Sequence, residues 1–242
     1  MRPFVLLTTR VNDVAAAEEY ESFLQMSGLT PGELRWVRLE AEPLPPLEFA
    51  DHSGFLLGGS QFNVSDPDEV KSPLQLRVET ELGVLLRRVL EVDHPFLGIC
   101  YGIGTIGRLI GATVDRRYSE ITNEVTISLT PEGVADPLCA GLESSFGAFV
   151  GHKEAIGELP DSATVLATGE GCPVQMFRYG ANVYATQFHP EMDGPAFARR
   201  IDLYRDAGYF PPPEAERLIA AAASSTANCG AVIGNFVRRY GG

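Results

Sequence analysis

Short apolar runs alternate with segments of helical periodicity over the first 111 residues, and this alternation limits the folds that the chain can adopt. Strands that alternate with helices build a parallel sheet with helices on both of its faces. The strands predicted in this half are residues 4–9, 35–39, 54–57 and 96–99, and the helices are residues 13–28, 72–92 and 101–111.

The helix predicted over residues 72–92 has clear signals at both ends. Ser72 precedes Pro73, a residue favoured at the first helical position, and Gln75 stands where a capping box places it. The helix should end near Val92, because the residue before Pro95 is biased away from helical geometry.

The second half of the chain contains more strands than helices. We therefore predict an α/β fold: a single domain over residues 1–242 with a central, mostly parallel sheet flanked by helices. Its core should be flavodoxin-like with additional antiparallel strands, and a C-terminal helical extension should occupy about 212–242. The further predicted strands are residues 125–129, 148–150, 163–168, 174–179 and 183–188; the further predicted helices are residues 195–207 and two segments after Pro213.

Charge and composition exclude several classes of protein. The net charge is −13, from 19 basic and 32 acidic residues, so a nucleic-acid partner is not expected. The apolar run at the N-terminus is too short for a signal peptide, and no run approaches the roughly 18 residues of a membrane span. The four cysteines form no CxxC pair, so we expect no metal, no cofactor and a cytoplasmic protein with reduced thiols.

A cysteine between a predicted strand and a predicted helix is the first candidate for catalysis. Cys100 is flanked by Gly98 and Gly102, and small residues at these positions allow a sharp, strained turn that exposes the side chain. The N-terminus of the following helix favours negative charge and therefore a thiolate. The alternative is a buried structural cysteine, which is common.

A second motif overlaps the first. Residues 102–107 fit the GxGxxG pattern of dinucleotide-binding proteins, which also joins a strand to a helix. That pattern usually opens the first strand–helix–strand unit, whereas here other strands come before it. The three glycines could instead let the helix pack closely against the sheet. A dinucleotide-binding module stays open as an alternative at this point.

A histidine and a glutamate near the end of the last predicted strand are candidates for a base and its orienting group. Pro190 favours an extended conformation for His189. In an extended segment, His189 and Glu191 point to the same side, so the carboxylate can hold the imidazole in one tautomer. A solvent-exposed loop is the alternative.

Together, these segments resemble the class I, or triad, glutamine amidotransferases. The resemblance rests on Gly98–Gly102, on Gln187–Glu191 and on the glycine turn Gly58–Gly59, in the order of the family. Residues 151–154 are similar to the Ser-His-x-Asp element of the family, and residues 171–177 resemble the branch of the amidotransferase part of GMP synthase. The resemblance covers roughly residues 1–200.

The resemblance implies a role for each of these segments. Cys100 would attack the amide carbon of glutamine to form a γ-glutamyl thioester, His189 would protonate the departing ammonia, and Glu191 would orient His189. The backbone N–H groups of Gly59 and Tyr101 would form the oxyanion hole. The residues expected to bind the substrate, a small molecule, are Gly58, Gly104, Gly151 and His152.

Two departures from the family pattern leave the substrate open. Gly104 stands where the family usually has glutamine, and Gly151 and Glu154 replace the serine and aspartate of the fourth element. Gly104 should leave room for a larger γ-glutamyl substrate. A glutaminase that supplies ammonia to a partner synthetase subunit is the leading hypothesis, and a γ-glutamyl peptidase is the alternative.

Overall fold

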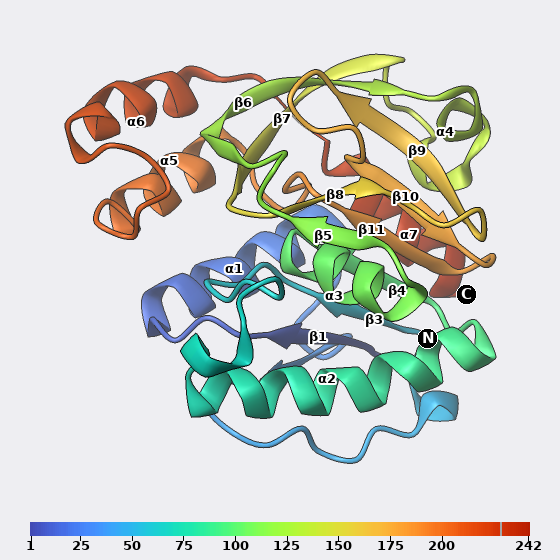
Figure 1. Ribbon diagram of the computed structural model, residues 1–242. Helices are drawn as coiled ribbons and strands as arrows, with labels where there is room; N and C mark the ends of the chain where they lie inside the picture. Colours follow the sequence, from blue (N-terminus) through green and yellow to red (C-terminus); the bar gives the residue numbers. More distant parts are fainter. Residues whose placement is uncertain (228) are drawn as a thin grey trace.

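The computed structural model describes residues 1–227 and 229–242. One sheet of nine strands runs through it in the order β2-β1-β3-β4-β11-β10-β9-β6-β7, and a separate ribbon pairs β5 with β8 (Figure 1). The strands are β1 (Phe4–Thr8), β2 (Leu34–Arg38), β3 (Gly54–Leu57), β4 (Phe96–Ile99), β5 (Thr113–Asp115), β6 (Glu120–Leu129), β7 (Ser145–His152), β8 (Ala155–Glu158), β9 (Ala163–Gly169), β10 (Met176–Tyr179) and β11 (Val183–Thr186).

The half of the sheet that contains β1, β2, β3, β4 and β11 is parallel. Its order matches the 2-1-3-4-5 arrangement of flavodoxin-like folds when β11 counts as the fifth strand. The strands β10, β9, β6 and β7 extend it in antiparallel pairs. The predicted α/β fold, with a flavodoxin-like core and additional antiparallel strands, is confirmed.

Helices cover both faces of the parallel half, because successive side chains of β1 point to opposite faces. Phe4 and Leu6 pack on the side of α1 (Asp13–Ser27) and α7 (Ala231–Tyr240). The intervening Val5 and Leu7 pack on the side of α2 (Pro73–Val92) and α3 (Tyr101–Ile110). Both faces of these strands are therefore buried, as their continuous apolar runs require.

The remaining helices lie in the C-terminal half. The short α4 (Pro131–Ala135) packs against β9, and α5 (Gly194–Leu203) pairs with α6 (Ala215–Ser224) at one side of the molecule (Figure 1). This pair has its own apolar cluster, which includes Phe149 of β7. We propose that residues 1–242 form one domain, because α7 returns from this pair to complete the core beside α1.

The structure changes several element boundaries. The strand predicted at 174–179 begins at Met176, and the one at 183–188 ends at Thr186, after which the chain leaves the sheet towards His189. Only half of the predicted capping box forms: Ser72 Oγ accepts from the Gln75 N–H at 3.1 Å, but the Gln75 side chain bonds to the carbonyl of Asn63 instead.

No helix within residues 1–227 or 229–242 combines the length and the apolar character needed to cross a membrane.

Candidate active site

The carboxyl ends of β3, β4 and β11 bring three predicted segments to one edge of the sheet. Ile99 pairs with Thr186, and the Cys100 N–H donates to the Thr186 carbonyl at 2.7 Å. On the other side of β4, Leu57 pairs with Gly98, so the Gly58–Gly59 turn follows beside Cys100. Adjacent parallel strands thus place the cysteine, the glycine turn and the His189 segment together, where open α/β sheets carry their sites.

Cys100 occupies a strained turn between β4 and α3. Its φ is 53° and its ψ is −86°, a conformation that costs a residue with a side chain about 1–3 kcal/mol. A Cβ atom on Gly98 would lie 2.9 Å from the Cα atom of Gly102, so the turn closes only with glycine at Gly98. Cys100 is partly exposed, whereas the other three cysteines are buried.

His189 and Glu191 form a buried pair. The distance from His189 Nδ1 to Glu191 Oε1 is 2.7 Å, and the His189 N–H donates to the carbonyl of Phe149 at 2.9 Å. Burial alone would lower the pKa of His189, but the charges of Glu191 and Cys100 outweigh burial and raise it. Burial alone would raise the pKa of Glu191, but its bond to His189 lowers it. The pair therefore favours an imidazolium beside a carboxylate.

The turn after β3 packs tightly around this pair. A Cβ atom on Gly59 would lie 3.1 Å from His189 Cε1 and 2.5 Å from Nη2 of Arg10. Gly58 lies against Glu19, and its N–H donates to the carbonyl of Leu7 at 3.0 Å. The structure thus places Gly59 beside His189, whereas the Gly58 N–H is already bonded within the sheet edge.

Cys100 lies between two hollows. One encloses about 350 Å³, including its open mouth, and is lined by Tyr101, Gly104, Gly151 and His152. The predicted substrate-binding residues other than Gly58 therefore meet there. The other encloses about 450 Å³, again including its open mouth, and lies on the His189 side of Cys100.

The segment that carries Cys100, His189 and Glu191 matches a known family. Residues 72–201 match the family model described as glutamine amidotransferase class-I. This chain is a class I glutamine amidotransferase. The match covers more than half of the chain and includes all three predicted catalytic residues.

Named relatives of this amidotransferase point to the same family. It is 34% identical to the glutamine amidotransferase-like protein YfeJ of Salmonella typhimurium over 161 residues, which are 65% of this chain and 64% of YfeJ. It is 28% identical to one subunit of the glutamine-hydrolyzing GMP synthase of Methanothermobacter thermautotrophicus, over 66% of this chain and 79% of that subunit. The match to the GMP synthase of Thermosipho africanus is 28% identical over 47% of this chain, but spans only 21% of that protein.

Solved structures show the same fold. A glutamine amidotransferase from Thermotoga maritima superposes with a TM-score of 0.78 at 18% identity, over 99% of this chain and 98% of that one. A GMP synthase subunit of Thermoplasma acidophilum superposes with a TM-score of 0.58 at 21% identity, over 93% and 96% of the two chains.

Two side chains lie close to Gly104 in this amidotransferase. A Cβ atom on Gly104 would lie 3.0 Å from Val64 Cγ2 and 3.3 Å from Glu154 Oε1. The prediction that Gly104 opens space for a larger substrate therefore finds no support on the side of Val64 and Glu154, and it stays a prediction for the side that faces the smaller hollow. The reason is tertiary: a loop after β3 and the turn after β7 approach the Cα atom of Gly104 closely.

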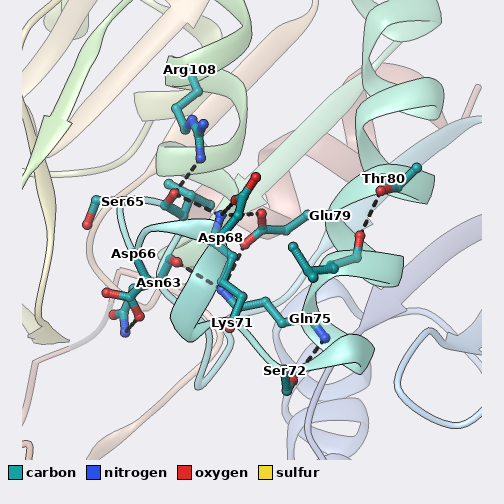
Figure 2. A network of polar contacts seen from close by, with 12 residues as sticks. Asn63, Ser65, Asp66, Asp68, Lys71, Ser72, Gln75, Glu79, Thr80 and Arg108 are labelled. Carbon is teal, nitrogen blue, oxygen red and sulfur yellow. Dashed lines mark hydrogen bonds and ion pairs between the residues drawn. The ribbon is translucent and has the colours of Figure 1, made fainter.

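That loop is fixed by polar contacts on several sides (Figure 2). The Glu154 carboxylate accepts from the N–H groups of Val64 and Ser65, each at 2.8 Å, so it is not free to hold a substrate amine. Arg108 of α3 donates to the carbonyl of Val64, and Gln75 of α2 donates to the carbonyl of Asn63 at 2.9 Å. The loop therefore forms a fixed wall of the smaller hollow.

Lys71 anchors the far end of the same loop. Its buried ammonium lies 2.7 Å from Glu79 and 3.1 Å from Asp68 (Figure 2). Burial alone would lower the pKa of Lys71, but hydrogen bonds to Glu79 and Asp68 raise it, so the amine stays charged.

His152 is held by hydrogen bonds at both ring nitrogens. Nδ1 lies 2.9 Å from the carbonyl of Glu154, and Nε2 lies 2.8 Å from Oε2 of Glu120. Cys172 lies near enough to give three potential metal ligands within 4.8 Å of one another. Glu120 Oε2, however, also accepts from Gln175 at 2.7 Å. These hydrogen bonds explain the cluster as a support for the β6–β7 edge.

The GxGxxG segment lies inside α3 and not in a loop before it. A Cβ atom on Gly107 would lie 2.5 Å from Ile156 Cδ1, so this glycine lets α3 approach β8. The glycines thus serve helix packing, and the arrangement does not favour the dinucleotide-binding alternative.

Several residues at the site were not predicted from the sequence. Arg10, Tyr209 and Arg200 line the larger hollow, and the Gln187 side chain donates to Cys100 Sγ at 3.9 Å. One signal for Arg10 was available: a charged residue closely follows the buried β1, at the edge where sites form. The others depend on contacts between distant segments.

Proposed function

We propose that this amidotransferase hydrolyses the side-chain amide of glutamine, or of a γ-glutamyl compound, through Cys100, His189 and Glu191. The observation that carries the proposal is the placement of a partly exposed cysteine, in a strained turn, beside a histidine that a buried carboxylate holds at 2.7 Å. A nucleophile, a base and an orienting group are the components of acyl transfer.

In the proposed reaction, the Cys100 thiolate bonds to the γ-carbonyl carbon. The oxyanion that forms accepts hydrogen bonds from the N–H groups of Gly59 and Tyr101. His189 gives its proton to the leaving nitrogen as the C–N bond breaks, which leaves a γ-glutamyl thioester. His189 then takes a proton from water, which attacks the thioester and releases glutamate.

We infer that ammonia released in this way is passed to a partner synthetase. Support comes from the relative in Methanothermobacter thermautotrophicus, which is named as a subunit of a glutamine-hydrolyzing GMP synthase. The four free cysteines fit the cytoplasmic location that we also propose.

The test is covalent labelling followed by product analysis. A glutamine analogue with an electrophile at the γ position should add to Cys100, as intact mass and peptide mapping would show, and glutamine should yield equal amounts of ammonia and glutamate. Labelling at Cys139, Cys172 or Cys229 instead of Cys100 would contradict the assignment. Absence of glutamate release, with glutamine and with every γ-glutamyl amide tried, would contradict the reaction.

A γ-glutamyl peptidase is the second candidate function. The larger hollow on the His189 side favours it, because glutamine itself has only hydrogen atoms on the nitrogen that would face this space.

A further inference from the structure

The larger hollow lies where a leaving group must lie. His189 lines this hollow but not the smaller one, and Cys100 lines both. A histidine that protonates the leaving nitrogen must be within hydrogen-bonding reach of it. If the γ-glutamyl part occupies the smaller hollow beside Tyr101 and Gly104, any substituent on the amide nitrogen enters the larger one.

The wall of the larger hollow carries more positive than negative charge. Arg10 and Arg200 are both buried and share one carboxylate, that of Glu19, at 3.1 Å and 3.9 Å respectively. Glu191, the next carboxylate, is bonded to His189. The two guanidinium groups thus share a single carboxylate, and the Cys100 thiolate, which also lines the hollow, loses its charge when it forms the thioester. A further anion in this hollow would therefore meet an incompletely paired, buried cation.

The two arginines are placed differently around this charge. Arg10 uses Nε to bind Glu19 and directs Nη2 towards Gly59, beside the reacting centre. Arg200 lies behind it, and within the described residues its Nε and Nη1 atoms have no hydrogen-bond partner. Burial, followed by the charge of Arg10, lowers the pKa of Arg200. The two cations therefore repel each other, and Glu19, which pairs with both, offsets part of this repulsion. A substrate carboxylate at the Nη atoms of Arg10 would offset it further.

The remainder of the hollow is aromatic and apolar. The Tyr204 ring lies 5.7 Å from the guanidinium carbon of Arg10 and 5.8 Å from that of Arg200, so it makes cation–π contacts with both. Burial raises the pKa of Tyr209 to about 12, so its hydroxyl keeps its proton and adds no negative charge. The other lining side chains include Met192, Phe197, Ile201 and Phe210.

We propose that this hollow is a subsite for the amine portion of a γ-glutamyl amide that carries a carboxylate, such as a γ-glutamyl amino acid, with Arg10 as the anchor of the carboxylate. The inference rests on the proposed function, because it assumes cleavage at Cys100. Guanidinium groups bind carboxylates through two parallel hydrogen bonds, and the apolar wall suits an aliphatic side chain.

The cleavage balances without any further reactant. The thiolate bonds to the γ-carbonyl carbon, the C–N bond breaks, and the nitrogen leaves with the proton from His189 as the free amine of an amino acid. Water then cleaves the thioester to give glutamate.

The test compares two substrates of the same size. γ-Glutamylalanine carries the carboxylate, and γ-glutamylalaninamide replaces it by a neutral amide. The wild-type chain should show a kcat/KM about tenfold to a hundredfold higher for the acid, the range given by a charge-assisted hydrogen bond. A ratio near one, with both substrates cleaved, would overturn the subsite and leave the proposed function intact. If the chain cleaved neither of these two substrates nor glutamine, the proposed function itself would be wrong.

Variants of Arg10 and Arg199 test which residue recognises the carboxylate of the substrate. Arg10→Gln should bring the acid-to-amide ratio to about one, whereas Arg199→Gln should leave it unchanged, since Arg199 is exposed and pairs with Glu18. Arg10→Lys serves as the second variant because it keeps a cation for Glu19; the ratio should fall by roughly threefold to tenfold through loss of the paired donors. An unchanged ratio in a folded Arg10 variant would overturn the role of Arg10.

Discussion

Cys100 has a positive φ, which residues with a side chain rarely adopt. In the described part of the chain, Asp93 is the only other non-glycine residue with a positive φ. The conformation persists because both flanks are fixed: the Cys100 N–H is bonded to β11, and Gly98 lies against Gly102 in α3. Strain of this kind survives where surrounding structure determines it, and it directs the thiol out of the sheet edge.

The first prediction concerns this thiol. Cys100→Ala should abolish turnover, a loss of about 10⁶-fold for a nucleophile of a catalytic unit, while the far-UV circular dichroism stays unchanged. Cys139→Ala is the matched control, because Cys139 is buried against Met176 and should lose only packing energy. Residual turnover in a folded Cys100→Ala chain would show that another group is the nucleophile.

The second prediction separates the base from its orienting group. His189→Asn should lose nearly as much rate as Cys100→Ala, because the members of one catalytic unit are not additive. Glu191→Gln should be milder, with kcat reduced by about 10³–10⁴-fold, since the base remains.

The pH dependence of Glu191→Gln gives a second readout. Glu191 raises the pKa of His189, so its removal lowers that pKa. The imidazolium that protonates the leaving nitrogen is then lost at lower pH, and the alkaline limb of kcat/KM should move to lower pH. A limb that stays in place would show that Glu191 does not control His189.

At the scale of elements, α3 shows how glycine can be required for packing instead of for backbone freedom. Gly104 and Gly107 lie in the middle of the helix, where glycine is unfavourable by about 1 kcal/mol relative to alanine. They are needed because Val64, Glu154 and Ile156 approach the helix closely. Neighbouring segments therefore lie close to the position that resembles the glutamine position of the family.

The third prediction tests that packing. Gly104→Gln should lower the free energy of unfolding by about 1–3 kcal/mol and should not lower the KM for glutamine, because its Cβ atom would press on Val64 and Glu154. The same substitution at Gly83, in α2, should stabilise the chain by about 0.5–1 kcal/mol, since only the flexible Arg87 side chain lies nearby. Urea unfolding of the two variants would measure both values. A stable Gly104→Gln chain with a lower KM would show that the pocket has room.

At the scale of the whole molecule, two apolar layers enclose the parallel half of the sheet, and a histidine packs against the rings of one of them. His94 lies between the rings of Phe49 and Phe55, at centroid distances of 4.7 and 4.9 Å. Burial, followed by the charge of His52, lowers the pKa of His94 to about 4.

The fourth prediction follows from this shift. The unfolded chain binds a proton at His94 near pH 6.5, but the folded chain does so only near pH 4. Between these values the unfolded state binds more protons, so stability is complete above about pH 6.5 and falls as the pH approaches 4. Since His94 is only half-buried, the loss should be on the order of 1 kcal/mol.

The comparison of wild type with His94→Gln measures that loss. The difference in free energy of unfolding between about pH 7 and pH 4.5 should be smaller in the variant, by chemical denaturation at each pH. Equal differences in the two chains would show that His94 titrates alike in the folded and unfolded states.

The sequence by itself determined the features that depend on neighbouring residues. The alternation of strand and helix predicted the parallel sheet, because each strand and helix carries its own hydrophobic period. The elbow at Cys100 and the shared direction of His189 and Glu191 were predictable for the same reason: a glycine two positions away, or a proline between two residues, acts within a few bonds.

Only the tertiary structure decided what surrounds these features. The close packing around Gly104 depends on Val64 and Glu154, which lie 40 and 50 positions away along the chain. The charged wall joins Arg10 of the first strand end to Arg200 of α5 through Glu19. Short-range patterns carry no record of which distant side chains meet, because that is set by the packing of complete elements across the sheet.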